Sequence, residues 1–187
     1  NEARAWLTGQ NLELPVERMQ WLERAIMDIP AADIREVSIR RPGGESVELR
    51  PGDEEGSVWV MLDPPADRKV EPAWKLRQTA NALARLNMAD VREHDPALIP
   101  EGAVASVFTT RDGLVFTATT FSDDAGDWVH FGASADEPRD TDTEIDIAAV
   151  DGRLSPWQFA LDSDRFKRLR PTVEEFLVAP EEVTAEP

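Results

Sequence analysis

Hydrophobic and polar positions along the chain follow a unit that occurs three times: a short apolar strand with a tryptophan, then a polar loop, then an amphipathic helix. The strands contain, in order, Trp6-Leu7, Val58-Trp59-Val60 and Trp128-Val129-His130-Phe131, and the helices that follow are predicted over 16–29, 73–88 and 162–177. Repetition of such a unit predicts a sheet covered by helices.

Each predicted helix has an apolar stripe at helical spacing, which indicates one buried face. Pro30 ends the first helix, and Pro171 predicts a break in the third, because proline cannot continue a helix from its interior. The stripes consist of Met19, Leu22, Ile26 and Ile29 in the first helix, Leu76, Ala80, Leu83 and Leu86 in the second, and Phe166, Leu169, Val173, Phe176 and Leu177 in the third.

Turn signals between alternating apolar positions predict β-hairpins. Pro42-Gly43-Gly44 separates two such runs, and Asp112-Gly113 separates two more. A further turn is predicted at 123–126. Short strands are also expected at 89–92, 145–150 and 154–161.

These elements predict an α+β fold, in tandem modules of mainly antiparallel sheet with helices packed on one face. Residues 1–100 are expected to hold a truncated module and one full module, and residues 101–178 a second full module. Residues 179–187 are predicted to be a disordered acidic tail. Chance similarity among short hairpin-plus-helix segments is the alternative to true repetition.

Charge narrows the range of partners. The 187 residues include 37 acidic and 20 basic side chains, for a net charge of −17. A field of that sign repels phosphate backbones and anionic membrane surfaces, so we expect no nucleic-acid partner. Solubility is the first interpretation of the charge, and adaptation to high salt is a second. The lack of cysteine excludes disulfides and thiolate chemistry.

The chain resembles the family catalogued as domain of unknown function 4340. The residues that carry the resemblance are Ala5-Trp6-Leu7 before Leu14-Pro15, Trp21-Leu22, Ile34-Arg35-Glu36-Val37, Leu83-Ala84-Arg85-Leu86 and Trp157-Gln158-Phe159-Ala160-Leu161. Such proteins usually carry one N-terminal membrane anchor followed by extracytoplasmic repeats, and they are often associated with ABC-type transporters of the gliding-motility kind. The family offers no established catalytic residues.

The resemblance implies a protein on the periplasmic face, anchored to the inner membrane, with a protein partner that includes transporter subunits. The chain begins at Asn1 without an initiator methionine and has no long apolar run. We therefore expect that an upstream anchor has been removed, and that the membrane is contacted only through that anchor.

Candidate catalytic chemistry is sparse. His94 and His130 are the available imidazoles, and neither lies in a recognisable motif, so structural roles are expected for both. Residues 140–146 place oxygen ligands at alternate positions, as a calcium loop does, but Ile145 occupies the position that requires glycine, and Asp151 the position that requires glutamate. A solvated acidic loop over 136–146 is the preferred interpretation.

Other polar groups also lack a catalytic context. Ser106, Ser122, Ser134 and Ser155 are not in nucleophile elbows, and Gly43-Gly44 lacks the lysine of a phosphate loop. The acidic pairs Glu54-Glu55 and Asp123-Asp124 lie in predicted turns, where solvation keeps carboxylates ordinary. We predict no catalytic, cofactor-binding or metal-binding residues and no cofactor.

Tryptophan is the remaining candidate for a binding surface, because it is enriched at interaction hot spots. Trp59 and Trp128 are expected to pack beneath helices, whereas Trp21 and Trp74 lie off the apolar stripes, with burial expected and partial exposure the alternative. The sequence predicts a non-catalytic interaction or scaffold domain. The alternatives are a module that binds a cationic or carbohydrate ligand, and a carboxylate-dependent hydrolase.

Overall fold

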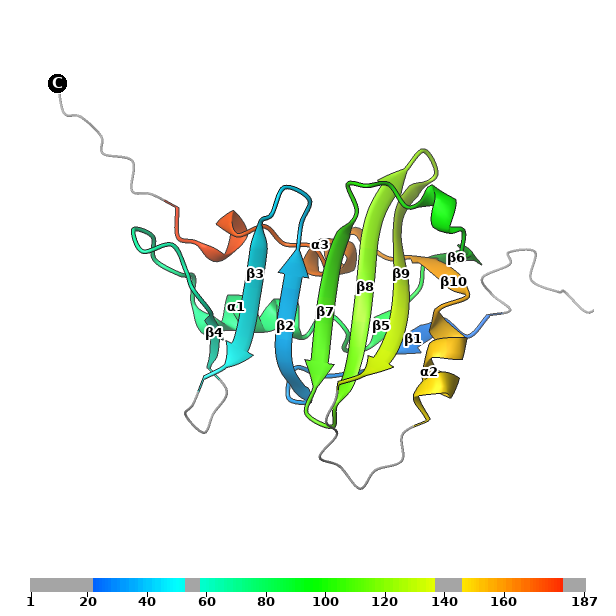
Figure 1. Cartoon of the computed structure of the whole chain (residues 1–187), viewed down its shortest axis with the longest axis horizontal. Helices are drawn as coiled ribbons and strands as arrows, with labels where there is room; N and C mark the ends of the chain where they lie inside the picture. Colours follow the sequence, from blue (N-terminus) through cyan, green and yellow to red (C-terminus); the bar gives the residue numbers. More distant parts are fainter. Residues whose placement is uncertain (1–21, 53–57, 137–145, 180–187) are drawn as a thin grey trace, which may run out of the picture.

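The computed structural model describes residues 22–52, 58–136 and 146–179. Its main element is an antiparallel sheet of eight strands in the order β4-β3-β2-β7-β8-β9-β10-β6 (Figure 1). A mainly antiparallel sheet with few helices confirms the predicted α+β class in its broad form. The strands, in that order, are Trp59–Met61, Ser46–Pro51, Ile34–Arg40, Val104–Thr110, Leu114–Asp123, Gly126–Ala135, Trp157–Ala160 and Asp90–Glu93.

The predicted hairpins are confirmed, and their turns depend on glycine. Gly43 and Gly44 between β2 and β3 have φ angles of 93° and 89°, and Gly113 between β7 and β8 has a φ of 82°. Residues other than glycine rarely adopt such positive φ angles, because their Cβ atom clashes with the backbone. The turn between β8 and β9 is closed by the Asp123 carboxylate, which accepts hydrogen bonds from the amides of Ala125 and Gly126.

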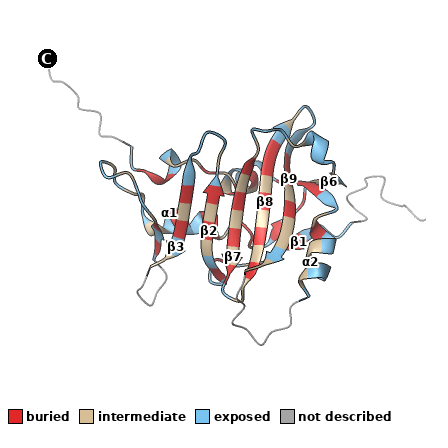
Figure 2. Cartoon of the chain, in the orientation of Figure 1, coloured by how far each residue is buried: buried red, intermediate tan, exposed pale blue. Residues whose placement is uncertain are grey.

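One face of the sheet forms the wall of the main hydrophobic core. Leu49, Val37, Phe108 and Phe116 are directly paired across four adjacent strands, and all four are buried. Buried and partly exposed residues alternate along β2, β7 and β8, which is visible as stripes in Figure 2. This alternation is typical of strands that have one face against a core.

A second layer covers that face. It contains α1 and α3, which lie behind the sheet in Figure 1, and a two-stranded ribbon of β1 and β5. Buried residues of these elements, among them Ile26, Leu76, Leu86 and Phe166, belong to the same core cluster as the sheet. The bounds are Ala73–Ala80 for α1, Ser163–Arg168 for α3, Ala25–Met27 for β1 and Leu86–Asn87 for β5. The other helices in the described segments are α2 (Ile147–Leu154) and the 3-10 turns η2 (Pro96–Leu98) and η3 (Glu174–Phe176).

Two predicted helices need correction. Of the helix predicted over 16–29, residues 16–21 lie outside the described residues, as does the Trp6-Leu7 strand before it, and Ala25–Met27 is strand β1. The helix predicted over 73–88 ends at Ala80, and Arg85 has a positive φ of 46° before β5 begins. The pairing of β1 with β5 explains both errors, because it gives these apolar segments cross-strand partners distant in sequence.

The predictions for the last part of the chain, from residue 145 to 177, are confirmed at some positions and wrong at others. The break at Pro171 is confirmed, since α3 ends at Arg168 and η3 begins at Glu174. The strand predicted over 145–150 is wrong where the structure describes it: α2 begins after Asp146, whose side chain caps it by accepting a hydrogen bond from the Ala149 amide. The strand predicted over 154–161 is shorter, and is β10.

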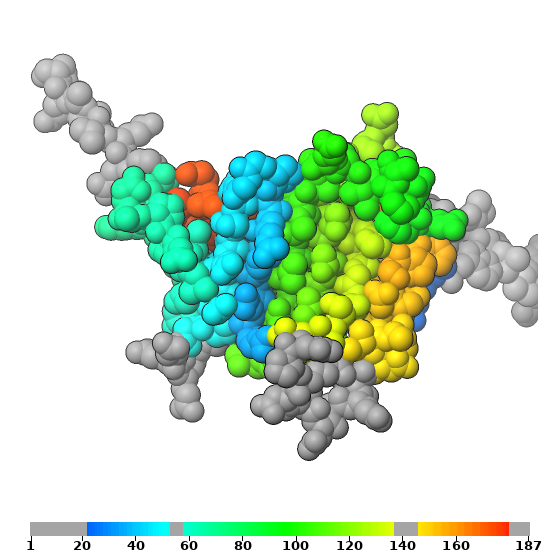
Figure 3. Space-filling view, in the orientation of Figure 1, coloured from blue at the N-terminus to red at the C-terminus, as the bar shows by residue number. Residues whose placement is uncertain are grey.

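Strands from both predicted parts of the chain lie in the same sheet. β2 pairs with β7 and β10 pairs with β6, so the sheet crosses the boundary predicted at residues 100 and 101. Of the tail predicted at 179–187, residues 180–187 lie outside the described residues. The face of the sheet opposite the second layer is turned to the viewer in Figure 3, where β2, β7 and β8 contribute to the molecular surface.

Candidate functional site

An apolar groove of about 490 Å³ lies at the end of the sheet, beside the edge strand β6. Trp157 and Phe159 of β10 and Val91 of β6 contribute to it from the sheet, since residues two apart on a strand share a face. Ile26 of β1 and Leu154 of α2 line it from the other elements. The groove therefore forms where the second layer and the edge of the sheet meet.

Two large apolar side chains in this groove are exposed. Trp157 has 43% of its surface accessible to solvent, and Leu22 has 40%. Both line the groove together with buried residues of the core such as Phe159. Contiguous exposed apolar surface of this kind marks an interaction site more often than an isolated exposed leucine does.

Charged residues accompany the apolar wall. Glu23 and Glu93 carry negative charge at the groove, and Arg153 carries positive charge. Glu93 lies directly opposite Trp157 in the pairing of β6 with β10. The exposed tryptophan thus has a carboxylate as its cross-strand neighbour.

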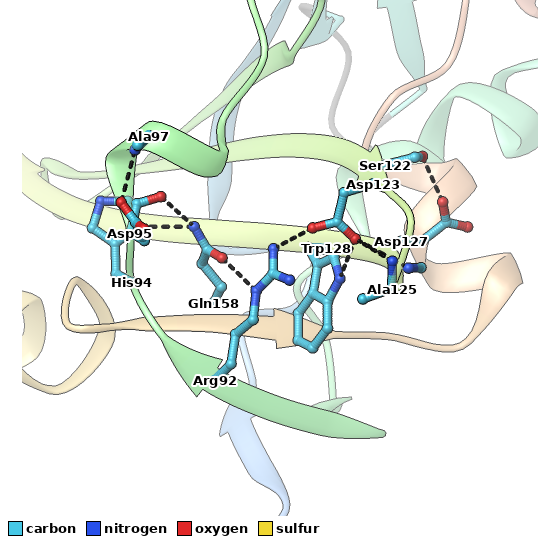
Figure 4. Close-up of polar contacts among 11 residues, drawn as sticks. Arg92, His94, Asp95, Ala97, Ser122, Asp123, Ala125, Asp127, Trp128 and Gln158 are labelled. Atoms are coloured by element: carbon cyan, nitrogen blue, oxygen red, sulfur yellow. Dashed lines mark hydrogen bonds and ion pairs between the residues drawn. The ribbon is translucent and has the colours of Figure 1, made fainter.

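The edge strand β6 is held in place by Arg92 on the opposite face of the sheet (Figure 4). The Arg92 Nε donates to the Gln158 side-chain oxygen at 2.6 Å, and its Nη2 donates to the Asp123 carboxylate at 2.7 Å. Its guanidinium also lies 3.9 Å from the centre of the Trp128 ring. One side chain therefore connects β6 to β10, β8 and β9.

Asp123 is the acceptor at the centre of this network. Besides Arg92, it accepts a hydrogen bond from the Trp128 indole at 3.1 Å and one from the Ala125 amide at 2.8 Å. Burial acts to raise the pKa of Asp123, but the hydrogen bonds and the positive charge of Arg92 together hold it below the ordinary 3.8. The carboxylate is therefore ionised when it pairs with Arg92 at neutral pH.

Trp128 and Phe121 form a small apolar cluster separate from the main core. They are directly paired across β8 and β9, and both are buried, yet neither belongs to the core cluster. Their strand neighbour Val129 does belong to that cluster, as expected when adjacent residues face opposite sides. Trp128 packs beneath Arg92 instead of beneath the helix predicted to cover it, whereas Trp59 is buried in the main core as expected.

The two histidines come together beside this network. Gln158, which is fully buried, directs its side-chain nitrogen to the Asp95 carbonyl and to Nδ1 of His94, each at 3.2 Å. The His94 ring stacks on that of His130, whose Nε2 is hydrogen-bonded to the Ser155 carbonyl at 3.0 Å. Burial, together with the charge of a protonated His94, lowers the pKa of His130 below 6.5, although the Ser155 carbonyl and Asp151 oppose this.

The other candidate residues are dispersed. The Ser106 hydroxyl donates to the Leu169 carbonyl, and the Ser122 hydroxyl donates to Asp127. Trp74 is 63% exposed, so the expectation of burial is wrong there. Residues 140–145 of the calcium-loop alternative, the pair Glu54-Glu55 and Trp21 lie outside the described residues. Within the described segments, no group of three or more histidine, aspartate or glutamate side chains is placed to hold a metal ion.

The groove and its anchor were not predicted. Arg92 and Trp157 belong to short strands that the sequence indicates only weakly, and their proximity depends on the pairing of β6 with β10 across 66 residues. Gln158 gives the one available signal: a polar residue between apolar neighbours in a strand must find hydrogen-bond partners if it is buried.

Comparison of the chain with protein-family models, with curated proteins and with solved structures gave no match. The resemblance to domain of unknown function 4340 therefore stays a prediction. None of the helices in the described ranges combines the length and the hydropathy that a membrane crossing requires.

Proposed function

We propose that the chain is a non-catalytic interaction domain of a membrane-anchored, extracytoplasmic accessory protein of an ABC transporter, and that the apolar groove is its contact with a protein partner. The observation that carries the proposal is the groove itself, in which Trp157 and Leu22 are exposed beside core residues. The link to transporters comes from the family resemblance.

The proposed occupant is an apolar segment of the partner that carries lysine or arginine beside its anchors. The chain has a net charge of −17, which favours a cationic partner over an anionic one. Glu23 and Glu93 supply local carboxylates at the groove. A partner with leucine or phenylalanine anchors fills the apolar wall, and its basic residues meet these carboxylates.

The Arg92 network supports this proposal because it makes the groove rigid before binding. An edge strand usually has one neighbour and frays easily, but β6 is tied to three other strands by a single guanidinium. A groove that is already ordered loses less conformational entropy when the partner binds.

A ligand-binding module is the second candidate. The groove has a volume typical of small-molecule sites, and the exposed ring of Trp157 can bind a cation on its face. The groove has two carboxylates and the guanidinium of Arg153, and this mixed set favours either form of binding over a carboxylate-dependent hydrolase, which needs acids that converge on one point.

The tandem modules are part of the same proposal. The antiparallel meander β2–β3–β4 with α1 constitutes one module, and the meander β7–β8–β9 with α3 constitutes the other. Their support is the similar order of strands in each and the packing of α1 against β4 and of α3 against β9. Native-state hydrogen exchange tests this division, which predicts two cooperative unfolding units.

The test of the function uses site-specific photo-crosslinking in the full-length membrane protein. A crosslinking amino acid replaces Trp157 in the groove or, as the matched control, Trp74, which is more exposed but lies on α1. We expect position 157 to crosslink to a transporter subunit and position 74 not to. Equal products from both positions, or no transporter subunit from position 157, contradict the proposal. Retention of a small cationic molecule by purified protein, lost in Trp157→Ala, identifies the second candidate instead.

A further inference from the structure

A second cleft, of about 340 Å³, lies on the helical side of the sheet, away from the groove. Arg41 borders it from the end of β2, Ser122 and Asp127 from the β8–β9 hairpin, and Lys167 and Arg170 from α3 and the turn that follows. None of these residues lines the groove. We call this space the basic cleft.

The basic cleft gathers cations in a chain that has few of them. Four of the six residues at 165–170 are lysine or arginine, although the whole chain has 20 such residues against 37 acidic ones. Lys167 and Arg170 from this segment line the cleft together with Arg41. These three cations outnumber Asp127 and Glu175, the two carboxylates that line the same cleft, although Arg41 also lies 3.7 Å from the Glu45 carboxylate.

Arg170 is held in place but has no counter-ion. Its guanidinium lies 5.2 Å from the centre of the buried Phe166 ring. Its backbone carbonyl accepts a hydrogen bond from Arg41 Nη1 at 2.6 Å, which brings the second arginine to the same place. Burial and the neighbouring charge of Arg41 lower the pKa of Arg170. Among the described residues, the Arg170 guanidinium donates to no acceptor and pairs with no carboxylate.

Each of the two carboxylates that line the cleft accepts a hydrogen bond from a hydroxyl group of the same cleft. Asp127 accepts the Ser122 hydroxyl at 2.6 Å, and Glu175 accepts the Thr172 hydroxyl at 3.4 Å. Asp127 is close enough to favour the charged form of Arg170 but not to form an ion pair with it. A half-buried guanidinium with free N–H groups beside a second arginine can bind an anion, because the anion accepts charge-assisted hydrogen bonds and offsets the repulsion between the two positive charges.

We propose that the basic cleft binds the oxyanion group of a small ligand, a phosphate or a carboxylate, between Arg170 and Lys167. Phe166 covers one face of the Arg170 guanidinium, which leaves its in-plane N–H groups for two parallel hydrogen bonds to the oxyanion. Lys167, which is exposed, adds a mobile ammonium group, and the Ser122 and Thr172 hydroxyls line the same space.

The test is an NMR titration of the uniformly labelled chain at constant ionic strength, with inorganic phosphate in one arm and citrate in the other. We expect saturable shifts of the amides of Phe166, Lys167 and Thr172, with the tighter arm identifying the preferred oxyanion. Arg170→Gln is expected to weaken binding by at least about tenfold, because it removes the charge-assisted hydrogen bonds. Arg168→Gln is the matched control, since Arg168 is in the same segment but does not line the cleft.

Three results overturn the proposal: no saturable shift with either anion, shifts spread evenly over basic residues, or equal weakening by Arg168→Gln and Arg170→Gln. If Arg170→Gln does not fold, Lys167→Gln replaces it and is expected to weaken binding about threefold or more, since it removes one exposed charge. Preserved affinity in that variant then counts against the site.

Discussion

The imidazole rings of His94 and His130 lie face to face, with their centroids 3.8 Å apart and their planes inclined by 16°. His94 follows the edge strand β6, and His130 is in β9, two residues after Trp128. The stack therefore lies next to the Arg92 network and belongs to the same set of contacts that holds the end of the sheet together. Protonation of both rings places two positive charges in contact.

The stability of the chain is expected to fall as the pH drops below 6.5. The pKa of His130 is lower in the folded state than the ordinary 6.5, so the unfolded chain binds a proton over an interval in which the folded chain does not. The contribution of neutral His130 to the free energy of unfolding is fully present above pH 6.5, and it is lost as the pH falls through the lowered pKa of the folded state. Urea unfolding at several pH values between 8 and 5 measures it. His130→Gln should flatten the slope over this interval, and an unchanged slope would contradict the assignment.

Replacement of Arg92 should destabilise the chain even when the charge is kept. The single nitrogen of a lysine cannot occupy the positions of both Arg92 Nε and Nη2, and an ammonium group cannot stack flat on Trp128. Arg92→Lys is therefore expected to reduce the free energy of unfolding by about 1–3 kcal/mol. Arg40→Lys is the matched control: Arg40 is exposed on β2, and a change within about 0.5 kcal/mol is expected. Chemical denaturation of both variants provides the comparison. Equal effects would show that the network contributes nothing beyond an ordinary surface arginine.

Replacement of two tryptophans, Trp59 of β4 and Trp74 of α1, should affect stability to very different degrees. Trp59 is 2% exposed and is part of the core, whereas Trp74 is on the outer side of α1. Trp59→Ala removes a buried aromatic ring and should reduce the free energy of unfolding by about 3–5 kcal/mol. Trp74→Ala should change it by less than about 0.5 kcal/mol. Thermal and urea unfolding test both, and a large loss from Trp74→Ala would mean that the placement of α1 is wrong.

Asp151 holds α2 against the edge of β9, where β10 no longer provides a partner. Its carboxylate accepts the Ala133 amide at 2.8 Å. Asp151→Ala leaves that amide without its acceptor and should cost about 1–2 kcal/mol, whereas Asp151→Asn keeps an acceptor oxygen and should cost less. Hydrogen exchange at the Ala133 amide is the direct readout. We expect faster exchange in the alanine variant, and equal rates in all three proteins would refute this role.

Local signals in the sequence account for the hairpins but not for their arrangement. Gly43-Gly44 and Gly113 mark turns because glycine alone adopts their backbone angles easily, and those turns lie where they were predicted. The repeat of the tryptophan strands was less informative. Trp59 and Trp128 occupy similar positions in the pattern, but one lies in the main core and the other on the opposite face beneath an arginine.

The misassigned segments are short apolar runs, for which periodicity does not separate helix from strand. Ile147–Leu154 is helical because Asp146 caps it, a signal that the sequence contains. Ala25–Met27 and Leu86–Asn87 are strands because they pair with each other, and no local pattern reveals a partner about 60 residues away. The groove depends on that pairing and on the pairing of β6 with β10, so its position could not be predicted.

The most direct test of the groove as the partner site is an NMR titration with two designed peptides, one of leucine and lysine and the other of leucine and glutamate. The proposal predicts saturable shifts at Ile26, Val91 and the Trp157 indole with the lysine peptide alone. The affinity should weaken as salt rises and should be lost in Trp157→Ser. Equal binding of both peptides, or shifts located away from these residues, would contradict it.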